Sequence, residues 1–221
     1  MAHAAYIPVM TLVNLKPSDE FAFAAGKGEV LLIACGALAR EIVDLIERNR
    51  WSAFDVACLP AKWHNTPDRI PEAVRMKIRE AKPHYKSIFV LYGDCGTGGA
   101  LDKVLAEESV ERIEGPHCYA FFSGNRAFAA KAEDEFTAFY LTDYLARHFD
   151  RLIWKGLGLD SHPELLPDYF GNYEKIVYLA QTRDEDLARK AMAAARRLGL
   201  AYEYRYVGYG ELESELARQQ R

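Results

Sequence analysis

The sequence lacks the features that mark secreted and membrane-spanning proteins. Its four cysteines are too few for a disulfide framework in a chain of 221 residues. The longest apolar runs, such as residues 30–35 and 88–92, have the length of a strand and are too short to cross a bilayer. The N-terminus has no charged segment followed by an apolar one, so no secretory signal is expected. We therefore expect a cytoplasmic protein with no membrane partner.

The sequence also lacks a large excess of charge of one sign. The formal net charge is −4, and neither a block of like charges nor a basic stripe is present, so nucleic acid is not an expected partner. No fixed-period repeat or low-complexity linker interrupts the chain. Hydrophobic residues make up 50% of the sequence, which is ample for a core and excludes a disordered chain.

What the sequence does contain is an alternation of strand-sized apolar runs and segments of helical period. Residues 1–28 are expected to form an irregular lead-in, and residues 29–221 a single α/β domain in which residues 175–221 are a candidate second lobe. The alternation predicts an α/β fold with a mainly parallel sheet, helices on both faces and Rossmann-like units. Strands are predicted at residues 29–35, 54–59, 88–92, 119–122, 175–180 and 201–207.

Helices are predicted between these strands. One carries Ile70, Val74 and Ile78 on a single face, and another, at residues 133–149, has a broad aromatic face. A capping box of Thr182 and Glu185 is expected to begin a later helix that ends at Gly199. The last helix is predicted at residues 211–218.

Three cysteines and one histidine stand beside strand ends or glycine-rich turns. Cys35 and Cys95 each end a predicted strand, Cys118 lies in a turn beside glycine and proline, and His64 lies in the loop after strand 54–59. Ligands bind at the carboxyl ends of parallel strands, so we expect these four side chains to share one rim. Three thiols and an imidazole form a tetrahedral Zn²⁺ set. Three thiols alone would hold a [4Fe-4S] cluster with one open corner.

Each of these residues also has a simpler interpretation. A single cysteine is often a small core residue, and Cys58, within a predicted strand, is interpreted in that way. His64 is a fourth metal ligand, a catalytic acid/base beside an open metal position, or a solvated loop histidine. His117 is a ligand, a hydrogen-bond donor to a ligand, or an exposed side chain.

The run from Gly93 to Gly99 allows a second kind of site. A strand, a glycine loop and a helix N-terminus form an anion cradle, which makes Gly93, Gly96 and Gly98 candidate cofactor-binding residues. The loop has neither the Lys-Ser/Thr of a P-loop nor the G-x-G-x-x-G pattern. The same glycines would leave N–H groups free to bond thiolate sulfur. Asp94 is a catalytic acid/base candidate or a helix cap. No Ser-His-Asp order or nucleophile elbow is visible.

Several segments resemble a known family. They are LLIACGAL, LPAKWHNTP, VLYGDCGTGGALD, GPHCYAFFSG and FYLTDYLARHF, and they resemble the uncharacterised domain of unknown function 1638 over about residues 29–210. The resemblance implies that Cys35, His64, Cys95 and Cys118 are recurrent polar positions. Many members carry His-Asp-Cys where this chain has Pro116-His117-Cys118, a departure that weakens the case for His117 as a ligand. Members commonly accompany corrinoid-dependent methyltransferases of the trimethylamine type and their corrinoid proteins.

Together these features predict a metal-dependent enzyme of methyl-group or one-carbon metabolism, of the transferase or lyase type, acting on a small molecule. The metal would be held by Cys35, Cys95, Cys118 and His64. The alternative is a non-catalytic accessory protein that delivers a metal or corrinoid to a corrinoid-dependent methyltransferase, with the loop-rich residues 156–173 as its docking surface. A metal with a purely structural role is a third alternative. A homodimer is the default oligomeric state.

Overall fold

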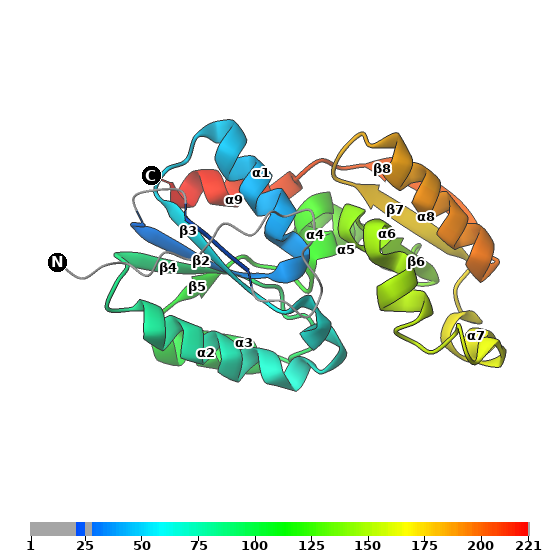
Figure 1. The fold of residues 1–221 in the computed structure, drawn as a ribbon, viewed down its shortest axis with the longest axis horizontal. Coiled ribbons are helices and arrows are strands. Elements are labelled where there is room, and N and C mark those ends of the chain that lie inside the picture. Colours follow the sequence, from blue (N-terminus) through cyan, green and yellow to red (C-terminus); the bar gives the residue numbers. More distant parts are fainter. Residues whose placement is uncertain (1–20, 25–27, 221) are drawn as a thin grey trace. The chain divides into compact units, whose positions relative to one another are not determined.

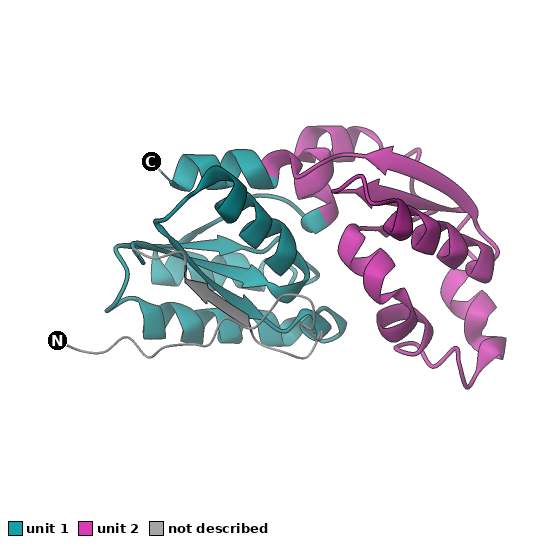
Figure 2. Ribbon diagram, turned by 45° about the horizontal axis from the view of Figure 1, so that its top comes forward, with its two compact units in different colours: residues 1–118, 212–221 teal, residues 119–211 magenta. Residues whose placement is uncertain are grey.

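The computed structural model describes residues 21–24 and 28–220, and its chain divides into two compact units (Figure 2). Unit 1 is formed by the described part of residues 1–118 with residues 212–220, and unit 2 by residues 119–211. Each unit contains its own sheet and its own helices (Figure 1). The predicted α/β fold with mainly parallel sheets is confirmed. Within the described chain, no helix has the length and apolar character needed to cross a membrane.

The sheet of unit 1 has the strand order β1-β3-β2-β4-β5. Its strands are β1 (Phe21–Ala24), β2 (Val30–Cys35), β3 (Phe54–Leu59), β4 (Ser87–Leu91) and β5 (Glu111–Arg112). Strand β1 pairs antiparallel with β3, and all the other pairs are parallel. The central strand β2 is buried along its whole length, which is why its sequence is continuously apolar rather than alternating.

Helices cover both faces of this sheet. Helices α1 (Ala39–Asn49) and α9 (Gly210–Gln219) lie on one face, and α2 (Ile70–Ala81) and α3 (Ala100–Glu108) on the other (Figure 1). The chain turns between strands and helices through the short 3₁₀ segments η2 (Gly36–Leu38), η3 (Ala61–Asn65) and η4 (Pro67–Arg69). Helix α1 buries Ile42, Leu45 and Ile46 at helical spacing.

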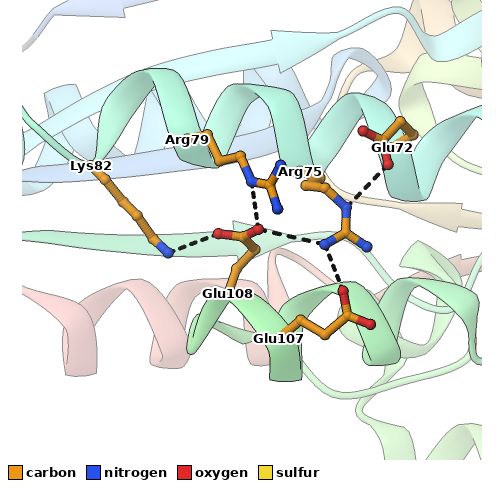
Figure 3. Close-up of polar contacts among 6 residues, drawn as sticks. All are labelled: Glu72, Arg75, Arg79, Lys82, Glu107 and Glu108. Carbon is orange, nitrogen blue, oxygen red and sulfur yellow. Dashed lines mark hydrogen bonds and ion pairs between the residues drawn. The ribbon is translucent and has the colours of Figure 1, made fainter.

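A polar cluster joins α2 to α3 (Figure 3). The carboxylate of Glu108, only 7% exposed, accepts hydrogen bonds of 2.8 Å from Arg79 Nε and from Lys82 Nζ. Arg75 Nη1 binds the neighbouring Glu107 at 2.6 Å. The bond from Lys82, with that from Arg79, lowers the pKa of Glu108 to about 2. Glu108 is therefore ionised at neutral pH, although it lies in the packed interface between two helices.

Unit 2 contains a smaller sheet with the strand order β6-β7-β8, and its strands are all parallel. Its strands are β6 (Ala138–Leu141), β7 (Lys175–Ala180) and β8 (Ala201–Tyr206). Its core forms where Leu187, Ala191 and Leu198 of α8 (Glu185–Leu198) pack with the side chains of β7. The remaining helical segments are α4 (Cys118–Ser123), α5 (Asn125–Ala130), α6 (Asp143–Phe149), η5 (Asp150–Trp154), η6 (Pro163–Leu165) and α7 (Leu166–Phe170).

Asp143 connects α6 to the end of β7. Its buried carboxylate accepts hydrogen bonds from Tyr178 Oη (2.7 Å), Gln181 N (3.0 Å), and both the amide (3.0 Å) and the hydroxyl (2.5 Å) of Thr182. Four donors satisfy the charge of a side chain that is 1% exposed.

Three predicted elements of this unit differ from the structure. Residues 119–122 form helix α4 and not a strand, because a run of four apolar residues fits either element and Phe121 and Phe122 are buried from a helix. The helix predicted at residues 133–149 begins ten residues later, after strand β6. Thr142 starts it, with its hydroxyl accepting from Leu145 N at 3.3 Å.

The third difference is the cap of α8. Thr182 donates its hydroxyl to Asp143, so Asp184 caps the helix instead and accepts from the amides of Asp186 and Leu187. Gly199 ends α8 with a φ of 73°, as predicted. Of the lead-in expected over residues 1–28, residues 1–20 and 25–27 lie outside the described residues.

Candidate metal and thiol site

Cys35 lies at the carboxyl end of the central strand β2. Its side chain is buried, and Sγ accepts a hydrogen bond of 3.3 Å from the amide of Ala37 at the start of η2. Because β2 pairs parallel with both β3 and β4, the loops that follow all three strands meet at this end of the sheet. The thiol therefore stands at the rim that the sequence predicted.

His64 reaches this thiol from η3. Cys35 Sγ lies 3.8 Å from Nδ1 and 4.0 Å from Nε2 of the imidazole. Nδ1 is also 2.9 Å from the carbonyl oxygen of Ala61, an arrangement in which the ring N–H donates to the carbonyl and Nε2 keeps its lone pair. The pKa of His64 is raised well above its usual value, chiefly by the negative charge of Cys35 and against the effect of burial. His64 is thus a contact partner of a buried thiol, although the residue itself is exposed.

Cys95 joins the same group from the loop after β4. Its thiol lies close enough to His64 to contribute to the raised pKa of the imidazole. Its backbone has a φ of 49°, and its amide donates to the carbonyl of Pro116 at 2.8 Å. The preceding residue, Asp94, bonds Gly115 through its amide at 3.0 Å. Two backbone bonds therefore hold the Cys95 loop against the segment that leads to Cys118.

This close approach explains one glycine. A Cβ at Gly93 would lie 2.7 Å from His117 Cα, which no side chain tolerates. Gly93 is thus required for two loops to touch, and its role in the structure is packing.

Cys118 is the first residue of α4. Burial raises the pKa of its thiol well above the usual value, and the charges of Cys95 and Cys35 raise it further. Neighbouring His117 has a lowered pKa, from burial and from the charge of His64. The four predicted ligands are thus electrostatic neighbours. That they share one metal stays a prediction, because within residues 21–24 and 28–220 no three His, Cys, Asp or Glu side chains are arranged to hold a metal ion.

Two further residues line the site. Tyr92, directly after β4, is 1% exposed, and its ring stacks on His64 with centroids 6.3 Å apart. Burial and the charges of Cys35, Cys58 and Cys95 raise its pKa well above the usual value. Its buried hydroxyl oxygen makes no hydrogen bond of good geometry with the described chain. Sequence reasoning missed Tyr92, although its place at the end of β4 was an available signal.

Cys58 is a core residue of β3, as predicted, and is 2% exposed. It is nevertheless close to the site, because the charges of Cys35 and Glu41 contribute to the raised pKa of its thiol, after burial.

The glycine loop is organised by Asp94. Its Oδ1 accepts from Gly99 N (2.8 Å) and Thr97 Oγ1 (2.9 Å), and its Oδ2 from Gly98 N (3.2 Å). These bonds lower the pKa of Asp94, the Gly99 amide most of all. The cradle that could bind an anion thus binds the protein's own carboxylate, and Asp94 orders the loop before α3, a helix that begins after Gly99 without a side-chain cap. Gly96 (φ 85°) and Gly98 (φ 60°) provide the left-handed turns of the loop.

Comparison with known proteins identifies the family. Residues 58–216 match the model described as "Protein of unknown function (DUF1638)". The chain belongs to the DUF1638 family. The resemblance noted in the sequence is therefore confirmed, and the matched DUF1638 segment contains His64, Cys95 and Cys118 but begins after Cys35.

Two other comparisons add no function to this DUF1638 protein. No curated protein matches it. Among solved structures, ornithine carbamoyltransferase from Pyrococcus furiosus matches with 13% identity and a TM-score of 0.28 over 82% of this chain. The chain spans 55% of that protein, and a likeness this low carries no argument.

Proposed function

We propose that this DUF1638 protein binds a thiophilic metal ion through Cys35, Cys95, Cys118 and His64 and is an enzyme of methyl-group or one-carbon metabolism. One observation carries the metal part of the proposal. The imidazole of His64 lies 3.8 Å from the thiol of Cys35 and close enough to Cys95 for that thiol to raise its pKa, and the two cysteines come from the ends of two adjacent strands. The one-carbon part rests on the resemblance to the family.

The chemistry of the donor set suits such an ion. Thiolate and imidazole are the ligands of structural and catalytic zinc sites, and a [4Fe-4S] cluster would use the three thiols alone. Histidine ligands commonly donate their second ring N–H to a carbonyl, which fixes the tautomer, and the contact between His64 Nδ1 and Ala61 O has this form. Nε2 is then the nitrogen available to a metal.

Bound zinc would lower the pKa of a substrate thiol or water. The protein's own side chains have separate roles. Asp94 holds the loop that carries Cys95, and its ionised carboxylate is fully engaged there. The Tyr92 hydroxyl is a buried donor beside the thiols. If His64 is not itself a ligand, it is the group placed to take or deliver a proton.

The test is metal analysis of protein purified without oxygen, with a visible spectrum. About one zinc per chain and no colour would support zinc, whereas a brown protein would support the cluster. Cys95→Ser should lose the metal and Cys58→Ala should keep it. Wild-type protein that takes up neither zinc nor iron and sulfide would refute the proposal.

The same preparation separates an enzyme from an accessory protein. Co-purification with a corrinoid protein, without turnover of small methylated compounds, would favour the accessory role.

A further inference from the structure

Strand β8 is an open edge of the unit 2 sheet. The strand order β6-β7-β8 puts β7 in the middle, and no other strand of the described chain pairs with the outer side of β8. Tyr204 is 45% exposed and Tyr206 48% exposed. An edge strand of six residues with exposed aromatic side chains is a template for pairing with another strand.

The backbone shows which residues offer hydrogen bonds at this edge. The amide of Ala201 donates to Glu174 O at 3.0 Å, and the amide of Val207 donates to Ala180 O at 3.0 Å, so both point toward β7. Because backbone groups alternate in direction along a strand, the N–H and C=O groups of Tyr202, Tyr204 and Tyr206 point outward. The three tyrosines thus present six backbone groups to a partner.

The sequence of β8, AYEYRY, is complementary to itself in one arrangement. We propose that β8 pairs antiparallel with β8 of a second copy of this chain, with Tyr204 on the two-fold axis. Tyr204 then faces its own copy, and each Tyr202 faces a Tyr206, all three as hydrogen-bonded pairs. Each Glu203 faces an Arg205 on the other side of the sheet. Aromatic pairs and opposite charges both stabilise cross-strand contacts.

Charge also fixes the register. Centring the pair on Glu203 or on Arg205 would put two like charges directly opposite each other, which is destabilising. Arg205 is already ordered for its role, because Glu135 binds its Nη2 at 2.6 Å from within the unit. The pairing would join two three-stranded sheets into one sheet of six strands.

Cross-linking through an introduced cysteine tests the axis directly. In Tyr204→Cys the two new thiols would stand on strands whose Cα atoms are about 5.5 Å apart, within disulfide range. In the matched control Ala201→Cys they would be about 20 Å apart, since three residues on each side separate them from the axis. We expect mild oxidation to give a covalent dimer with the first variant only, above the background of the wild-type cysteines. Equal cross-linking of both variants, or of neither, would overturn the proposal.

A second pair of variants tests the backbone bonds in the full chain. Tyr204→Pro removes an N–H that points outward and is not used by β7, so the unit should still fold. Tyr204→Thr keeps the N–H and a strand-forming side chain. Light scattering should give the dimer mass for wild type and the Thr variant, and the monomer mass for the Pro variant with an unchanged circular dichroism spectrum. A wild-type chain that stays monomeric at micromolar concentration would contradict the pairing, as would a dimer that survives Tyr204→Pro.

Discussion

The sulfur of Cys35 lies 3.8 Å from Nδ1 of His64, which comes 29 residues later in the chain. A strand end and a short 3₁₀ turn bring the two together, since β2 and β3 run parallel and η3 follows β3 directly. The charge of a thiolate in contact with an imidazole stabilises the protonated ring, and the raised pKa of His64 is the result.

His64→Ala distinguishes two roles for this histidine. If His64 is a ligand, the variant should retain far less metal than wild type after dialysis. If it is an acid/base beside the metal, the variant should keep the metal and lose about 10² to 10⁴ in rate. Metal analysis and turnover on the same preparation give the answer. Full metal content with unaltered activity would leave His64 as a solvated loop histidine.

Cys58→Ala should be mild in its effects. The side chain is buried in β3, so removing the sulfur should lower the free energy of unfolding by about 1 kcal/mol, measured by urea denaturation. Metal content should not change. A metal-free Cys58→Ala protein would show that the wrong three cysteines have been assigned.

Asp94→Ala should loosen the loop that carries Cys95. The variant leaves the amides of Gly98 and Gly99 without their acceptor, at a cost of about 1–2 kcal/mol in unfolding free energy. Asp94→Asn keeps one acceptor oxygen and should lose less. If both variants have wild-type stability but no activity, Asp94 is catalytic and its role in ordering the loop is secondary.

The lowered pKa of Glu108 predicts how the stability of the fold changes as the pH falls. Its pKa in the folded protein is about 2, below the usual value of 4.5 for a glutamate, so the folded state holds the carboxylate ionised. Its contribution is therefore complete above pH about 4.5 and is lost as pH falls toward 2. Urea midpoints measured across this range should fall less steeply for Glu108→Gln than for wild type. Glu107→Gln, at a carboxylate that is 60% exposed, is the control and should follow the wild-type curve.

The sequence predicts those parts of the fold in which burial dictates composition. Strand β2 is apolar throughout because both of its faces are covered, and Gly199 ends α8 because a left-handed residue is needed there. The errors occur where a side chain has a distant partner. Thr182 has the spacing of a cap, but Asp143 takes its hydroxyl, 39 residues away in the chain.

The candidate site follows the same division. Strand ends place Cys35 and Cys95 on one rim by topology alone. The contact of Gly93 with His117, which holds the Cys95 loop to the segment before Cys118, depends on a tertiary approach that no local pattern encodes. The sequence did not single out Tyr92 as a site residue, because an aromatic ring at this position is equally typical of a buried strand end.

Asp143 has a consequence for how unit 2 folds. Its carboxylate bonds both the side chain of Tyr178 and the amides that follow β7, so neither helix α6 nor the end of that strand reaches its final form alone. Until the chain from Asp143 to Thr182 closes into a loop, the Asp143 carboxyl group has none of these four partners and remains hydrated. We expect the four bonds to form together and to tie the opening of α6 to the opening of β7, so that local fraying of either element is suppressed.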